Sequence, residues 1–239
     1  TDSVNEDAAV TKTASQDDVL NDDSDPESDS FSVTHIKKKD GGTDSAVSSG
    51  TNNSNGTSVT GTYGTLVIGA DGSYTYTADQ DAADDLDAND TAPDTFVYTI
   101  TDDHGATDTA DLVITVTGVN DDPVAVNDTD TVTADQSVSK SESQDDVMND
   151  DSDPDDDDTF TVTHIKKYGA ASNSTVSSST TNANGTSVTG TYGVLTIGAD
   201  GSYTYNANNA DSLADGIEGT DTFVYTICLL YTSDAADDP

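Results

Sequence analysis

Oxygen-bearing side chains that could bind a hard cation gather at three recurring places in the sequence. The first is the run Asn-Asp-Asp-Ser-Asp-Pro at 21–26, which returns at 149–154. The second is the run Asn-Asp-Asp-Pro at 120–123, followed by Asn127 and Asp128, and the third is the pair Asp102 and Asp103. Calcium takes six to eight oxygen ligands, and closely spaced Asp and Asn residues on one turn can supply several of them. The predicted ligands are Asp22, Asp23, Asp25, Asp102, Asp103, Asn120, Asp121, Asp122, Asp128, Asp150, Asp151 and Asp153.

Identical spacing of the Asn-Asp-Asp-Ser-Asp-Pro cluster in two places favours calcium binding over a role in solubility alone. Two like charges about 4 Å apart repel by roughly 1 kcal/mol even in water, and a divalent ion removes that cost. For any single aspartate, a solvated turn remains the alternative. The clusters are not EF-hand loops, because they lack the central Gly and the closing Glu. The prediction is therefore several structural Ca²⁺ ions at sites of a different design.

The overall charge of the chain is strongly negative. The 239 residues include 47 acidic side chains, 43 of them Asp, and seven basic ones, all Lys, for a formal net charge of −40. Such a surface repels phosphate backbones and anionic lipids, so we expect no nucleic-acid partner and no membrane insertion. Leu, Ile, Val and Phe make up about 17% of the chain, which lies below the roughly 20% under which a highly charged chain is usually read as disordered. Asp favours turns, and the abundant Thr, Val and Tyr favour strands, so almost no helix is expected.

Signals for catalysis are weak, and the chain is predicted not to be an enzyme. Its three histidines are His35, His104 and His164, and the first and last occupy the same position of a repeated Thr-His-Ile-Lys-Lys segment, where strand residues are expected. Zinc sites would have too few ligands. No nucleophile motif accompanies the many Ser and Asp residues. Paired carboxylates could suggest glycoside hydrolysis, but an active site rarely recurs unchanged in each repeat.

The sequence contains an internal repeat of one long unit. Three pairs of segments match at offsets of 127 to 129 residues: 56–76 with 185–205 (19 of 21 residues identical), 15–26 with 143–154, and 94–100 with 221–227. A period this long fits a tandem array of whole domains rather than a solenoid. We place the first repeat at 1–128 and the second at 129–227. The first lacks its leading strand and the second its closing strand.

Residues 228–239 break the repeat, and we interpret them as a divergent, non-native tail. They contain Cys228, the single cysteine, so no internal disulfide is possible. Thr1 is not an initiator Met and no signal sequence follows it, which indicates an interior piece of a longer protein.

Alternating apolar residues predict six to eight short strands per repeat. Leu66 and Ile68 precede an Asp-Gly pair, and Tyr74 and Tyr76 follow it, which indicates a hairpin. The other inward faces are Phe96, Tyr98 and Ile100 on one strand, Leu112, Ile114 and Val116 on the next, and Phe31 and Val33 on an earlier one, with Val124 and Val126 opening the second repeat. Short strands joined by polar loops predict an all-β fold of tandem immunoglobulin-like, cadherin-like antiparallel β-sandwiches.

Several of these segments, in order, resemble a known family. The run GTYGTLVIGADGSYTYTAD and then DTFVYTITDDHGATDTADLVITVTGVNDDP is similar to the VCBS repeat, and VLNDDSDP with VNDDPVAVND is similar to related bacterial cadherin-like repeats. The resemblance implies a secreted or cell-surface, extracellular protein, often a large RTX-type adhesin of attachment and biofilm formation. It also implies that neighbouring repeats share ions at the acidic junction and form a calcium-stiffened stalk. Surface glycans or other cells are the possible partners beyond the chain.

Three other functions stay open from the sequence. A carbohydrate-binding or accessory module of a polysaccharide-degrading enzyme would stack sugars on exposed aromatics, but there is no Trp. Core packing is the expected role of the strand tyrosines Tyr74, Tyr76, Tyr203 and Tyr205. A disordered acidic polymer that binds mineral or ions, and an ice-binding surface of Thr-rich strands, are the remaining alternatives.

Overall fold

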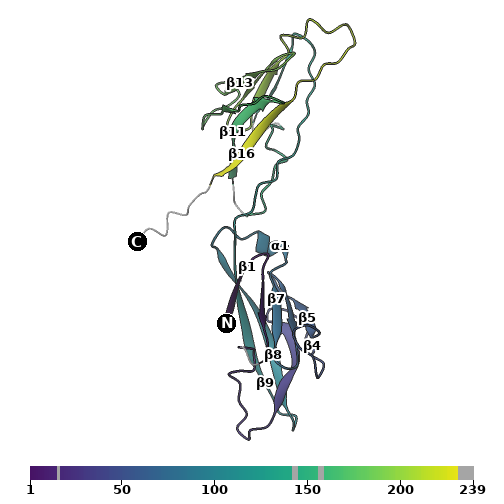
Figure 1. Cartoon of the computed structure of the whole chain (residues 1–239), viewed down its shortest axis with the longest axis vertical. Helices are drawn as coiled ribbons and strands as arrows, with labels where there is room; N and C mark the ends of the chain where they lie inside the picture. Colours follow the sequence, from purple (N-terminus) through teal and green to yellow (C-terminus); the bar gives the residue numbers. More distant parts are fainter. Residues whose placement is uncertain (15–16, 142–144, 156–158, 231–239) are drawn as a thin grey trace, which may run out of the picture. The chain divides into compact units, whose positions relative to one another are not determined.

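The computed structural model describes residues 1–14, 17–141, 145–155 and 159–230. The chain divides into two compact units, unit 1 from Thr1 to Asp121 and unit 2 from Asp122 onward (Figure 1). Each unit is built almost wholly of strands, and the one α-helix among the described residues is the single turn α1, Asp81–Asp84. The predictions of an all-β fold and of almost no helix are confirmed.

Unit 1 contains two sheets. The first has the order β1-β9-β8-β3-β4, and the second has the order β2-β7-β6-β5. The strands of the first sheet are β1 (Asp2–Asn5), β9 (Thr107–Thr117), β8 (Thr91–Asp102), β3 (Phe31–Lys38) and β4 (Ser45–Ala46). Those of the second are β2 (Ala9–Lys12), β7 (Tyr74–Thr77), β6 (Thr65–Ile68) and β5 (Thr57–Thr60). All neighbours pair antiparallel except β1 and β9, which run parallel.

The core of unit 1 lies between the two sheets. Alternate residues of each strand point inward, because successive side chains of a strand face opposite sides of the sheet. Tyr76 and Phe96, from different sheets, are fully buried and pack edge to face with ring centroids 6.1 Å apart. The predicted inward residues Leu66, Ile68, Tyr74, Tyr98, Leu112, Ile114, Val116 and Val33 are also buried, and Ile100 packs against them. The predicted inner faces of β6, β7, β8 and β9 are confirmed, whereas on β3 Val33 is buried and Phe31, also predicted to point inward, is only half-buried.

The hairpin predicted around the Asp-Gly pair is formed by β6 and β7, with Ile68 opposite Tyr74. Gly72 has a φ of +82°, a value that costs glycine little and other residues much. The carboxylate of Asp71 accepts hydrogen bonds from the N–H and hydroxyl of Ser73, which holds the turn. A second tight connection, at 103–106, joins β8 to β9.

Unit 2 repeats most of this plan. One sheet has the order β10-β15-β14-β13, and the other has β12-β11-β16. The strands are β10 (Ser137–Lys140), β15 (Tyr203–Asn206), β14 (Val194–Ile197), β13 (Thr186–Thr189), β12 (Ser174–Thr175), β11 (Thr159–Lys167) and β16 (Phe223–Leu230). Strand β16 matches β8 and continues through Cys228 to Leu230 opposite Thr159. Within 122–230, no strand of the described residues matches β9.

The second unit has its own, smaller core. Val162, Ile165 and Ile197 are almost completely buried, and Tyr205 packs edge to face on Phe223 with ring centroids 6.1 Å apart. Val124, predicted to begin a strand of this unit, makes only an isolated bridge to Ser152. The small set of apolar residues is therefore concentrated in two buried layers, which is how so acidic a chain forms folded units. In the part of the chain that the structure describes, no helix is long and apolar enough to cross a membrane.

Candidate metal centre

In unit 2, five oxygen atoms surround the hydroxyl of Tyr225. The hydroxyl lies 2.9 Å from the carbonyl oxygen of Val147 and 3.0 Å from that of Val126. It lies 3.1 Å from Oδ2 of Asp128, and 3.4 and 3.3 Å from Oδ1 and Oδ2 of Asp151. The N–H of Val126 donates to Oδ1 of Asp151 at 2.7 Å, so this carboxylate also holds the segment that enters the unit.

This cluster around Tyr225 has more acceptors than donors. A tyrosine hydroxyl carries one proton and can donate it to only one of the five oxygens at a time. Two of the five belong to backbone carbonyls and three to carboxylates. Converging carboxylate and carbonyl oxygens form the type of ligand set that calcium takes.

The carboxylates of the Tyr225 cluster are electrostatically strained. The pKa of Asp128 is raised to about 6, first because its carboxylate is partly withdrawn from water and then because Asp150, Asp151 and Asp146 repel its charge. Withdrawal from water also raises the pKa of Asp151, and the charge of Asp150 adds to it. A bound cation would remove this cost, so the residues present fit a divalent ion.

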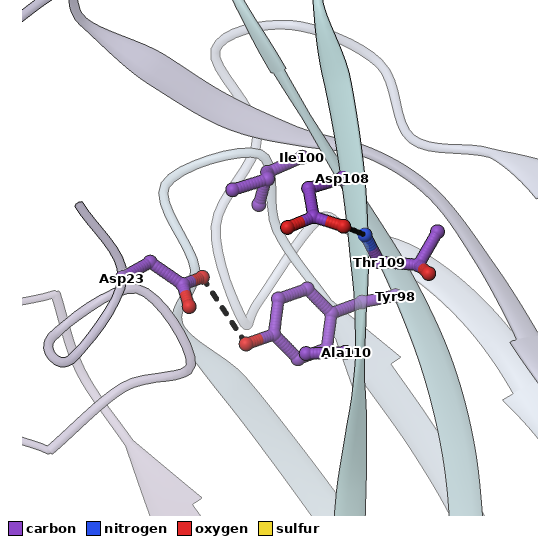
Figure 2. Close-up of a pocket in the computed structure, with 6 residues that line it drawn as sticks. All are labelled: Asp23, Tyr98, Ile100, Asp108, Thr109 and Ala110. Carbon is purple, nitrogen blue, oxygen red and sulfur yellow. Dashed lines mark hydrogen bonds between the residues drawn. The ribbon is translucent and has the colours of Figure 1, made fainter. Parts of the chain in front are cut away.

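The equivalent tyrosine of unit 1, Tyr98, organises a similar group of oxygens. Its hydroxyl donates to the carbonyl oxygen of Val19 at 2.9 Å or to Oδ2 of Asp23 at 3.1 Å (Figure 2). A small cavity of about 30 Å³ adjoins them, and Asp108 of β9 faces it from the other side, as Figure 2 shows. Its lining residues are Asp23, Tyr98, Ile100, Asp108, Thr109 and Ala110. Partial burial raises the pKa of Asp23, and the charges of Asp22, Asp108 and Asp18 raise it further.

The two clusters occupy the same place in their units. Tyr98 and Tyr225 are related by the offset of 127, and Asp23 and Asp151 by the offset of 128. Each adds one further carboxylate of its own, Asp108 in unit 1 and Asp128 in unit 2. Of the predicted ligands, the structure brings Asp128 and Asp151 together. Two others are exposed and add negative charge nearby, Asp150 beside Asp128 and Asp22 beside Asp23. Asp108 was not predicted from the sequence, because a single aspartate within a strand does not belong to a run of closely spaced acidic residues.

Other predicted ligands hold their own loops. Oδ1 of Asp25 accepts the N–H groups of Glu27 and Asp29, and Oδ1 of the equivalent Asp153 accepts that of Asp155. The side chain of Asp103 accepts a hydrogen bond from the hydroxyl of Ser30. Such turns are common for Asp and need no ion.

Asp102 belongs to a second group at the tip of the β8–β9 connection. Oδ1 of Asp102 accepts the N–H groups of Ala106 and His104, and these bonds hold the pKa of Asp102 below its ordinary value. Nδ1 of His104 lies within hydrogen-bond distance, 2.7 Å, of Oδ2 of Asp29. One ligand atom from each of Asp29, Asp102 and His104 lies within 4.8 Å of the others. No metal role was predicted for His104 from the sequence. Its contact with Asp29 joins residues that lie 75 positions apart in the chain.

Three residues of the predicted junction, Asn120, Asp121 and Asp122, lie at the boundary between the two units. The side-chain amide of Asn120 donates to the backbone carbonyl of Asp121. Asp121 is half-buried and Asp122 is exposed. Their role as shared ligands stays a prediction.

A carboxylate that no motif had indicated supports each unit, the buried Asp94 in unit 1 and the half-buried Asp221 in unit 2. Asp94 is 1% exposed, and it accepts the N–H groups of Thr62 and Tyr63 at 3.0 and 3.1 Å and the hydroxyl of Tyr76 at 2.9 Å. The equivalent Asp221 accepts matching bonds in unit 2. Burial alone would raise the pKa of Asp221, but these hydrogen bonds outweigh it and hold the pKa below its ordinary value. Both carboxylates are structural.

The strand tyrosines are core residues, as predicted. Tyr74 and Tyr76 are 2% and 0% exposed, Tyr203 is 8% exposed, and Tyr205 is half-buried. Their hydroxyls donate to carboxylates of the same unit. They offer no open aromatic surface on which a sugar could stack.

Acidification should stabilise unit 2 when calcium is absent. The pKa of Asp128 in the folded chain, about 6, exceeds the ordinary aspartate value of 3.8, so folding favours the protonated form. The contribution is fully present below the unfolded pKa and is lost as the pH rises through 6. The melting temperature of unit 2 should therefore rise from about pH 7.5 to about pH 5 in chelator, measured by scanning calorimetry.

The Asp128→Asn variant should show a weaker pH dependence over this range, while Asp135→Asn, an exposed site with the same charge change, should behave as the parent chain. Equal pH dependence in all three proteins would show that Asp128 does not titrate as described.

Comparison with known families agrees with the duplicated plan. The family model of the bacterial cadherin-like domain matches residues 1–118 and again residues 120–228. A search of curated proteins finds no match to the chain. The two matches together cover most of the sequence and correspond to the two compact β-units, which repeat the same tyrosine cluster. The chain therefore belongs to the bacterial cadherin-like domain family and carries two tandem copies of that domain.

Proposed function

We propose that this chain is a calcium-stiffened structural segment of a secreted or cell-surface bacterial adhesin of the VCBS or RTX type. Its tandem repeats would space an adhesive tip from the cell during attachment and biofilm formation, and they would have no catalytic role. Domains of this family are repeat modules of bacterial surface proteins. The direct partners of the segment would be neighbouring repeats, with surface glycans or other cells bound by the tip.

The observation that carries the proposal is the excess of oxygen acceptors around Tyr225. Carboxylates of Asp128 and Asp151 and carbonyls of Val126 and Val147 converge there around a single proton. Unit 1 repeats the tyrosine, the carbonyl and one carboxylate with Tyr98, Val19 and Asp23. Duplication of this arrangement fits a structural ion that every repeat needs.

The Tyr225 cluster also suggests how an ion would stiffen the chain. Val126 and Asp128 belong to the segment through which the chain enters unit 2, and Asp151 belongs to the body of that unit. Without a cation, Asp128 and Asp151 repel each other and weaken the attachment of the segment. An ion between them would replace repulsion with attraction and would leave fewer residues free to bend.

Extracellular calcium would suit this type of site. Calcium-binding modules outside the cell have dissociation constants of about 10⁻⁴–10⁻³ M, because the ion is abundant there. Sites made from turn carboxylates and backbone carbonyls fit this range of dissociation constants better than the much lower range of the cytosolic calcium buffers. The chain would then be stiff outside the cell and self-repelling where calcium is scarce.

Small-angle scattering in calcium and in chelator tests the stiffening. Calcium should increase the maximum dimension of the chain and narrow its distribution of interatomic distances. The double variant Asp128→Asn/Asp151→Asn should lose most of that response, and Asp135→Asn should keep it. Identical scattering of the parent chain in calcium and chelator would contradict the proposal.

A further inference from the structure

Two loop regions of unit 1 bring together an imidazole and two carboxylates that belong to neither tyrosine cluster. The end of β8 supplies Asp102, the connection to β9 supplies His104, and the loop that precedes β3 supplies Asp29. One ligand atom from each side chain lies within 4.8 Å of the other two. The group therefore combines one nitrogen donor and two oxygen donors from distant parts of the sequence.

The two loop regions are joined by contacts that do not involve these three side chains. The hydroxyl of Ser30 donates to the carboxylate of Asp103, and the N–H of Asp103 donates to the carbonyl oxygen of Ser30 at 3.2 Å. The ladder between β3 and β8 extends to this point, because Phe31 lies opposite Asp102. The backbone therefore fixes the distance between the loops, and an ion would not have to assemble them.

Hydrogen bonds orient the three side chains. Oδ1 of Asp102 accepts the N–H groups of His104 and Ala106, each at 2.8 Å, which fixes the orientation of this carboxylate. Nδ1 of His104 lies 2.7 Å from Oδ2 of Asp29. A hydrogen bond between these two atoms requires one proton, and a metal ion would bind the same lone pairs with release of that proton. The side chain of His104 is 76% exposed, so water can fill the remaining positions around an ion.

The imidazole nitrogen sets this group apart from the oxygen clusters around the tyrosines. Calcium takes oxygen ligands, whereas imidazole suits zinc, copper and nickel. Carboxylate oxygens also bind Zn²⁺, at about 2.0–2.2 Å. The small number of His and Cys residues predicted too few ligands for zinc, but Asp29, contributed by a distant loop, raises the number here to three. The formal net charge of −40 also draws cations toward the chain.

We propose that Asp29, Asp102 and His104 of unit 1 bind one divalent transition-metal ion of the Zn²⁺ type, at a site separate from the calcium ions of the tyrosine clusters. Nδ1 of His104 supplies the nitrogen ligand, each aspartate supplies one carboxylate oxygen, and water completes the coordination. The bound ion joins the loop that precedes β3 to the β8–β9 connection. The inference does not rest on the calcium proposal, because Tyr98 and Asp23 take no part in it.

Nuclear magnetic resonance of the histidine side chains tests the site in the whole chain, prepared without a histidine tag. The titration with Zn²⁺ is performed in about 10 mM calcium, so that sites made only of oxygen ligands are filled. Zn²⁺ should shift the imidazole signals of His104 saturably. The signals of His35 and His164 should stay in place, because both side chains lie on strands and contact the hydroxyl of the preceding threonine.

Calorimetric titration with Zn²⁺ in the same buffer compares three variants. His104→Gln keeps a polar side chain near Asp29 but removes the imidazole, and Asp29→Asn removes one carboxylate. Each should weaken zinc binding by about tenfold or more, since the loss of even an outer partner of a metal ligand costs 10–100-fold. His35→Gln, the matched control, should bind Zn²⁺ as the parent chain does. All three variants should keep the calcium-dependent rise in melting temperature, which separates this site from the tyrosine clusters.

Three results would overturn the proposal. The first is a Zn²⁺ titration that leaves the His104 signals unchanged or shifts all three histidines equally. The second is undiminished zinc affinity of His104→Gln. The third is zinc binding that calcium at about 10 mM abolishes, because the group would then be an ordinary oxygen site for calcium.

Discussion

Replacing Asp94 by alanine should lower the free energy of unfolding of unit 1 by about 3 kcal/mol or more. The carboxylate is 1% exposed and accepts bonds from Thr62, Tyr63 and Tyr76. Each buried donor left without a partner costs about 1–3 kcal/mol, since water cannot reach it. For a unit of this size the loss corresponds to a fall of roughly 10 °C or more in melting temperature.

Scanning calorimetry of the whole chain measures this effect, with Asp79→Ala as the control. Asp79 lies in the same unit and accepts only exposed hydrogen bonds, from the hydroxyl of Thr65 and the side-chain amide of Gln80, so its loss should change the free energy of unfolding by less than about 1 kcal/mol. The fall for Asp94→Ala should be the same in calcium and in chelator, because this carboxylate is structural. A fall that disappears in chelator would mean that Asp94 binds the ion instead.

Calcium should raise the melting temperature of unit 2. The double variant Asp128→Asn/Asp151→Asn should melt below the parent chain in calcium, and at or above it in chelator. At about 10 mM calcium, an ion bound with a dissociation constant of 10⁻⁴–10⁻³ M stabilises by about 1.4–2.7 kcal/mol. That corresponds to a rise of roughly 5–15 °C for a unit of this size. The variant should not show this rise.

In chelator the same variant should be at least as stable as the parent chain, because it removes two carboxylates whose charges repel. The parent chain should therefore melt above the variant in calcium, and at or below it in chelator. Asp135→Asn should follow the parent chain in both conditions. A variant that melts below the parent chain by the same amount in both conditions would assign Asp128 and Asp151 a purely structural role.

The strands could be predicted because their signal is local. Alternation of Leu66 and Ile68, then of Tyr74 and Tyr76, places the same side chains inward in any antiparallel sandwich. The Asp-Gly pair between them gives the position of the turn. The second repeat preserves the same alternation with different loop lengths, which supports the same assignment.

The composition of the metal cluster could be predicted only in part. Asp23 and Asp25 stand two residues apart in one motif, yet Asp23 reaches Tyr98 and Asp25 holds its own loop. The two roles differ because the path of the backbone places the two carboxylates beside different partners. The contacts of Tyr98 with Val19 and of Tyr225 with Val126 span 79 and 99 residues, and no local pattern encodes them.

The carboxylates of Asp94 and Asp221 illustrate a related limit. Each follows a turn region and precedes an apolar strand, which is also where an exposed aspartate would stand. Their hydrogen bonds depend on a tight loop of the opposite sheet, where a Cβ at Gly61 or Gly190 would collide with the carboxylate. Matching Gly61 to Asp94 requires the fold.

Calorimetric titration of the parent chain with Ca²⁺ tests the central claim most directly. We predict saturable binding in the sub-millimolar to millimolar range. A variant that carries Asp23→Asn, Asp108→Asn, Asp128→Asn and Asp151→Asn should lose the sites at both tyrosine clusters. No saturable binding to the parent chain, or undiminished binding to this variant, would contradict the account.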